Sequence, residues 1–215
     1  MFSLISLAAV LAASGPACSA PSDLLQAPTA DVAISSKFDA TVWGGEQIKT
    51  RNTITLSAPG AAAPQLTLLD ETSGKSTQAP AKLSPCGVVT NDRLNTALVS
   101  YNNALALATS APSNVAAGAS WNGTVNMYVS QTEQLNIPVK ITVAKKDASG
   151  TLLQATGRTS GILTQFNTPY ELTYQGAALF KDGKLLRADS AAQEAVQAGP
   201  QSQTMTFAWT ISRKS

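Results

Sequence analysis

The sequence contains no histidine, and this absence removes several chemistries at once. Most serine and cysteine hydrolases use a histidine as the base that activates the nucleophile. Histidine is also the commonest protein ligand for zinc and most transition metals. We therefore predict no catalytic residues, no metal centre and no cofactor, and we expect that the protein is not an enzyme.

Charge is also scarce, because Asp, Glu, Lys and Arg together make up 13% of the chain and the formal net charge is only +2. The basic residues do not cluster, which argues against nucleic acid as a partner. A glycosidase would need two carboxylates facing each other at about 5–10 Å. The carboxylates are instead scattered over predicted turns and polar strand faces, and we interpret them as solvated surface charge: Asp70, Glu71, Glu171, Asp182, Asp189 and Glu194.

There are only two cysteines, Cys18 and Cys86. Cys86 could form an intramolecular disulfide only with Cys18, and only if Cys18 survives processing unmodified. Otherwise we read Cys86 as a small buried apolar residue, with an intermolecular disulfide as the alternative.

Residues 1–20, MFSLISLAAVLAASGPACSA, predict an export signal. The apolar run from Phe2 to Ala13 is too short to cross a hydrocarbon core of about 30 Å as a helix. No Lys or Arg precedes Lys37, although export signals normally carry such a charge near their start. Either the signal is weak or the true start lies upstream of Met1. A buried core helix is the alternative interpretation of this segment.

Two cleavage points remain open. A cut after Ala20 fits the preference for small residues and releases a soluble protein that begins at Pro21. A cut after Ala17 makes Cys18 the first residue of the mature chain. Residues 15–18, Gly-Pro-Ala-Cys, resemble a bacterial lipoprotein box, whose cysteine is acylated. In that case residues 21–30 are a tether, and the lipid on Cys18 is the only membrane contact that we predict. Both alternatives predict a periplasmic or outer-envelope location.

The remainder, residues 31–215, predicts a single β-rich domain. Apolar and polar residues alternate in the segments around 32–42 and 48–56, and Gly44-Gly45 marks a turn between them. The alternation returns over 135–143 and 170–180, and the Asp182-Gly183 pair favours a tight hairpin. Pro138 suggests a strand edge or a bulge.

Three segments depart from this pattern. Five apolar residues follow helical spacing and predict an amphipathic helix over about 92–109, namely Leu94, Leu98, Tyr101, Leu105 and Ala108. We expect the glycines within 151–165 to leave only one or two short strands there. The alanine-rich segment 191–198 fits either a weak strand or a short helix.

These patterns predict a mainly β fold, a curved antiparallel meander that is half-barrel or sandwich-like, with the helix packed on it. Such a sheet and helix could enclose an apolar cavity, for which the candidate lining residues are Leu135, Ile137, Val139, Phe207 and Trp209. The expected function is to bind an apolar small molecule or peptide there. The alternative is a structural protein of the cell envelope that contacts another envelope protein through its surface or strand edges.

Overall fold

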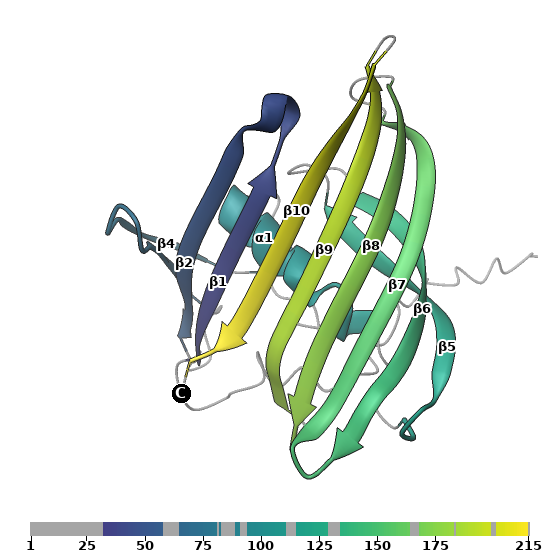
Figure 1. Cartoon of the computed structure of the whole chain (residues 1–215). Coiled ribbons are helices and arrows are strands. Elements are labelled where there is room, and N and C mark those ends of the chain that lie inside the picture. The colour runs from purple at the N-terminus through teal and green to yellow at the C-terminus, as the bar shows by residue number, and fades with distance from the viewer. Residues whose placement is uncertain are drawn as a thin grey trace, which may run out of the picture.

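The computed structural model describes residues 32–57, 65–80, 82, 89–90, 94–110, 115–128, 134–163, 168–182, 184–198 and 201–214. Within them, ten strands form one antiparallel sheet in the order β4-β3-β2-β1-β10-β9-β8-β7-β6-β5, and one helix, α1, lies against it (Figure 1). The predicted signal 1–20, the linker 21–30 and both cysteines lie outside the described residues.

The N-terminal part of the sheet is a four-strand meander. Its members are β1 (Val32–Thr41), β2 (Gln47–Ser57), β3 (Gln65–Asp70) and β4 (Ser76–Pro80). A short 3-10 turn, η1 (Trp43–Gly45), joins β1 to β2, and Gly44 adopts there the positive φ of 76° that glycine accepts without strain. The inner face of β1 and β2 carries the buried Ile34 and Ile54, as the two-residue alternation predicts.

The C-terminal part is a six-strand meander of longer strands. They are β5 (Ser120–Tyr128), β6 (Gln134–Asp147), β7 (Gly150–Leu163), β8 (Thr168–Lys181), β9 (Lys184–Ala198) and β10 (Gln201–Arg213). The two meanders join side by side where β10 pairs with β1, with Phe38 opposite Trp209. The chain therefore builds one continuous sheet from two segments that flank the helix in sequence.

The sheet curves around α1. Neighbouring strands lie about 4.8 Å apart, so the five steps from β10 to β5 would separate these strands by about 24 Å in a flat sheet. Yet α1 packs against β1, β9, β10 and β5. The predicted curved meander with one packed helix is confirmed, and a single open sheet, with β4 and β5 at its two ends, replaces the sandwich-like alternative.

The helix is shorter than predicted, because α1 spans Thr96–Leu105 and not 92–109. Its start is fixed by Asn95, whose side chain accepts a hydrogen bond from the Leu98 N–H at 3.0 Å. At its end the Ala106 N–H bonds to the Asn103 carbonyl, a tighter turn than the α-helix makes. A separate 3-10 turn, η2 (Ala108–Ser110), follows, so Ala108 is buried just beyond the helix.

Two segments form longer strands than the sequence predicts. The strand β7 runs without interruption through Gly157 and Gly161, since β8 pairs with it along its whole length. The segment 191–198 is part of β9, and it is a strand because β8 and β10 supply backbone hydrogen-bond partners on both sides. Tertiary pairing thus outweighs the low strand propensity of glycine and alanine.

The strands β6 and β7 diverge at one end. Their register ends at Val139↔Gly157, although β6 begins at Gln134 and β7 continues to Leu163. Pro138, which lacks an N–H, sits at this point of divergence and pairs only with β5 among the described residues. Pro138 therefore lies where β6 has a paired strand on one side only, as the predicted strand edge requires. The bulge in β6 lies elsewhere, between Val143 and Lys145.

No helix among the described residues is both long and apolar enough to cross a bilayer. The core lies between α1 and the inner face of the sheet, where Tyr101, Tyr174 and Met127 are among the largest fully buried side chains.

Candidate functional site

A cavity of about 140 Å³ lies between α1 and the inner face of the sheet. The helix contributes Thr96, Val99, Ser100 and Asn103 to its wall. Five strands contribute the remaining lining residues, which are Phe38, Met127, Tyr128, Leu172, Ala192, Glu194, Phe207 and Trp209. The wall is thus mainly apolar with a few polar groups, the composition typical of small-molecule sites.

Three stacked aromatic rings form one side of this cavity. The Trp209 ring lies 5.8 Å from the Phe38 ring on β1 and 5.8 Å from the Phe207 ring on its own strand, between centroids. The interplanar angles are 20° and 9°, so all three rings present similarly oriented faces. This arrangement depends on the β1–β10 register, which sets Phe38 opposite Trp209.

Glu194 is the only charged residue among the described residues that line the cavity. It lies on β9, opposite Leu172 of β8 and Met205 of β10, and only 6% of its surface is exposed. Its Oε1 atom is buried and has no hydrogen-bond partner. Burial raises the pKa of this carboxyl above its ordinary value, because desolvation penalises the ionised form.

Our interpretation of Glu194 as solvated surface charge was wrong. The signal that would have identified it is parity: Glu194 shares the inner face of β9 with Ala192 and Val196, and all three are buried. In a strand, residues two apart point to the same side of the sheet. A carboxylate on the inner parity, between two apolar residues, is therefore a sequence-level indication of a buried acid.

The other polar side chains of the cavity for which partners are known are engaged with backbone groups. Asn103 donates from Nδ2 to the Tyr128 carbonyl at 2.9 Å and accepts from the Tyr128 N–H at 2.7 Å. Ser100 donates to the Thr96 carbonyl at 2.8 Å. An unsatisfied buried polar atom is unusual in a folded protein. Glu194 is therefore the lining residue of this cavity with a buried oxygen atom that has no hydrogen-bond partner.

A comparison with protein-family models and with curated proteins finds no match for this chain. A partly open, mainly apolar cavity with a stacked aromatic side and one acidic residue can hold a small organic molecule in a defined orientation.

The structure brings together only two of the five predicted lining residues. Phe207 and Trp209 line the cavity. Leu135, Ile137 and Val139 lie on β6, where Ile137 and Val139 are buried in the core and Leu135 packs against it, but none of the three lines this cavity. Sequence alternation identified their inner face correctly, whereas the position of the cavity depends on where α1 lies over the sheet.

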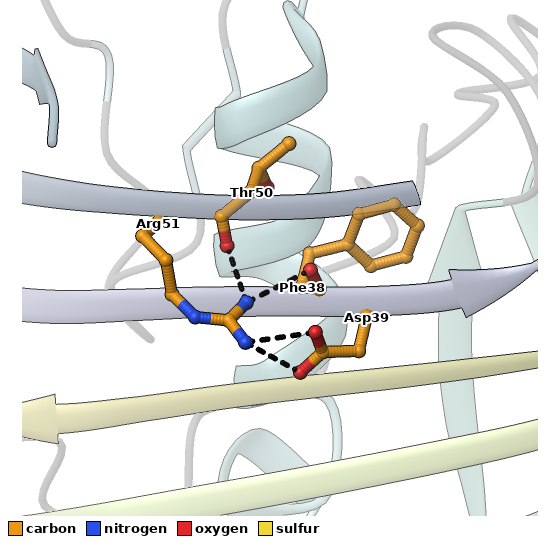
Figure 2. Close-up of polar contacts among 4 residues, drawn as sticks. All are labelled: Phe38, Asp39, Thr50 and Arg51. Carbon is orange, nitrogen blue, oxygen red and sulfur yellow. Dashed lines mark hydrogen bonds and ion pairs between the residues drawn. The ribbon is translucent and has the colours of Figure 1, made fainter. Parts of the chain in front are cut away.

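The backbone behind Phe38 is held from the outer face by Arg51 of β2. Its guanidinium donates to the Phe38 and Thr50 carbonyls, at 3.2 and 2.8 Å, and to both Asp39 carboxylate oxygens (Figure 2). The helix lies on the opposite side of these strands in this view. The arrangement ties β1 to β2 at the point where β1 presents Phe38 to the cavity.

A second cavity, of about 360 Å³, lies over the outer face of β1, β8, β9 and β10. Its floor includes the small side chains Ala191 and Ala208, and its rim carries Asp39, Thr173 and Gln193 together with other Thr and Gln residues. The Asp39 carboxylate already accepts two hydrogen bonds from Arg51. Although larger, this cavity has no buried polar atom without a partner, so we favour the inner cavity as the candidate site.

Proposed function

We propose that this protein is an exported, non-catalytic binding protein that holds a small, mainly apolar ligand between α1 and the sheet. The main support for this proposal is the 140 Å³ cavity, which is lined by three stacked aromatic residues and by the buried Glu194, whose Oε1 has no hydrogen-bond partner. The export component rests on the signal pattern of residues 1–20.

The size of the cavity limits the ligand. An engineered apolar protein cavity of about 150 Å³ holds one benzene molecule. A cavity of about 140 Å³ therefore suits a single aromatic ring or a short aliphatic group, rather than a whole lipid. A longer ligand or a peptide would have to place one side chain or terminal group in the cavity.

Toluene is a suitable probe, with binding followed by NMR line broadening and by Trp209 fluorescence in a variant that lacks the other two tryptophans. Ala192→Leu would fill the cavity, because Ala192 lines it from β9, and should abolish toluene binding. Ala191→Leu is the matched control, since Ala191 is exposed on the outer face of the same strand. Equal toluene binding by wild type and Ala192→Leu would refute the proposal.

Mass spectrometry of the protein recovered from its own cells tests the export component. Loss of the first 17 or 20 residues identifies the cleavage point, and added acyl mass on Cys18 identifies a lipoprotein. A ligand retained under native conditions would appear in the same spectrum. An unprocessed N-terminus on the recovered protein would contradict export.

A structural role in the cell envelope is the second candidate, favoured by the divergence of β6 and β7. Over Arg158–Leu163, β7 pairs with β8 on one side and with no described strand on the other. Ile162, on this segment, is the most exposed large hydrophobic residue described, at 61%. A free strand edge with an exposed apolar side chain is suited to adding a strand from another protein.

A photocrosslinking residue at position 162, introduced in the cell, tests this role. We expect a covalent adduct with a second envelope protein there. The matched control is position 154, which is also exposed on β7 but lies where β6 and β8 both pair with the strand. Equal adducts at both positions, or none at 162, would argue against strand addition.

A further inference from the structure

Among the described residues that line the inner cavity, none carries a positive charge to match the carboxyl group of Glu194. The helix α1 has the sequence TALVSYNNAL and contributes no charged residue. The register partners of Glu194 are Leu172 and Met205, and the other titratable side chain among the described lining residues is Tyr128. Every described element packed around Glu194 is therefore uncharged at this point, and no described lysine or arginine lines the cavity.

The aromatic wall adds a second, independent preference. The faces of Trp and Phe rings carry negative electrostatic potential and attract cations within about 6 Å. Here Phe38, Trp209 and Phe207 stack beside one another and line the same cavity as Glu194. A buried acidic residue and three aromatic residues thus line a space the size of one small molecule.

We propose that the ligand of this cavity is an amine, a primary or secondary ammonium group carried on a single aromatic ring or short apolar chain. This inference rests on the proposed binding function and specifies its ligand class. The ammonium would pair with the Glu194 carboxylate and lie against the aromatic rings, while the apolar part would fill the space beside Leu172 and Val99.

The charge balance of binding follows from the environment of Glu194. Burial raises the pKa of the free carboxyl above its ordinary value, because desolvation penalises the ionised form. A bound ammonium ion stabilises the carboxylate instead, so any proton that Glu194 carries in the free protein at the pH of the experiment is released to solvent when the amine binds. Binding of the amine is therefore coupled to proton release, whereas binding of a neutral molecule of the same shape is not.

Three probes of similar shape distinguish the ligand classes: benzylamine, benzyl alcohol and toluene. We expect benzylamine to bind at least about tenfold more tightly than toluene at pH 7.5, since a desolvated ion pair with aromatic contacts supplies that difference. Glu194→Gln should remove the preference for benzylamine, so that benzylamine no longer binds more tightly than toluene. Glu171→Gln is the matched control, because Glu171 is exposed on β8 and pairs with Arg158 on the surface.

Calorimetry in two buffers of different ionisation enthalpy measures the released proton directly. Proton release with benzylamine should grow as the pH of the measurement is lowered toward the pKa of free Glu194, whereas toluene should release no proton at any pH. Toluene binding by Glu194→Gln shows that this variant is folded. If toluene or benzyl alcohol binds wild type as tightly as benzylamine does, the amine assignment is wrong while the binding function stands. If no probe binds and Ala192→Leu changes nothing, the binding function itself fails.

Discussion

Two adjacent asparagines on α1 connect the helix to backbone groups at two separate places. Asn102 exchanges two hydrogen bonds of 2.9 Å with the N–H and carbonyl of Val89, and Asn103 does the same with Tyr128 at the end of β5. Both side chains are at least 97% buried. Each amide therefore replaces a missing backbone partner, and Asn103 also fixes one wall of the candidate site.

Asn103→Ala should lower the free energy of unfolding by about 2–3 kcal/mol, because it leaves the Tyr128 N–H and carbonyl without partners in a part-buried position. Urea denaturation monitored by circular dichroism measures this loss. Asn126→Ala is the control, since Asn126 is exposed on β5, the strand that also carries Tyr128. This substitution should change the free energy of unfolding by less than about 0.5 kcal/mol. Equal effects of the two substitutions would show that the Asn103 pair contributes little.

Glu194 should make folding stability depend on pH in a direction that a surface carboxylate would not produce. Its pKa is raised above 4.5 in the folded protein, so between pH 4.5 and the raised value the unfolded chain has lost a proton that the folded chain retains. Stability therefore falls as pH rises through this window. Relative to wild type, Glu194→Gln should therefore gain stability as the pH rises from 4 to 8.

Urea midpoints at the two pH values test this expectation. The exposed Glu171→Gln variant should show no such gain, because it removes only a surface carboxylate. A difference between Glu194→Gln and wild type that does not grow with pH would mean that Glu194 finds a compensating partner in solution.

At the level of single elements, Gly157 allows β6 and β7 to approach at their point of divergence. A Cβ atom at this position would lie 2.4 Å from the Pro138 carbonyl oxygen and 2.6 Å from Val139 Cγ1. Gly157→Ala should therefore cost about 2–3 kcal/mol of stability, because a backbone carbonyl cannot move aside as a flexible side chain can.

Gly123→Ala provides the comparison within the same sheet. There the nearest atom to the added Cβ is Ile141 Cδ1 at 3.0 Å, the end of a flexible side chain, and we expect a loss below about 1 kcal/mol. Thermal melts of both variants compare the two losses of stability. If Gly157→Ala is as mild as Gly123→Ala, the two strands are not held together at this glycine.

Sequence periodicity was sufficient for the elements that bury one face. The alternation around Ile34, Ile141 and Leu172 predicted strands correctly, since each of these residues is buried on the inner face. It was insufficient where local propensity and tertiary pairing disagree. It predicted only short strands around Gly157, and it left the alanine-rich part of β9 open between a strand and a helix. A glycine or alanine in a strand is held by its neighbours on both sides, and those neighbours are distant in sequence.

The candidate site was only half predictable for the same reason. Phe207 and Trp209 could be assigned to an inner face from their spacing alone. Their meeting with Phe38 depends on the β1–β10 register, which joins residues about 170 positions apart. The contribution of α1 depends on how the sheet curves. No local pattern in the sequence encodes either relation, although the parity that Glu194 shares with Ala192 and Val196 did indicate its burial.

For the whole molecule, the joining of two meanders and the packing of α1 across both predict cooperative unfolding. The helix contacts β1 in one meander and β5, β9 and β10 in the other, so neither meander can open fully without exposing the other's core. Strands near the middle of the sheet have backbone partners on both sides, whereas β4 and β5 lie at its ends. We therefore expect the slowest amide hydrogen exchange in β8, β9 and β10.

The alanine-rich end of β9 distinguishes protection that comes from position in the sheet from protection that comes from local strand propensity. Alanine is a poor strand former, and by propensity alone segment 191–198 would be among the least protected of the sheet. Its amides instead lie between β8 and β10, with Ala192 opposite both Tyr174 and Phe207. Exchange there should require global unfolding, while β4 should exchange through local opening at a much lower free energy. Mass-spectrometric hydrogen exchange with peptides covering both segments compares them directly. Equal exchange of β9 and β4 would show that local propensity, rather than position in the sheet, governs stability in this fold.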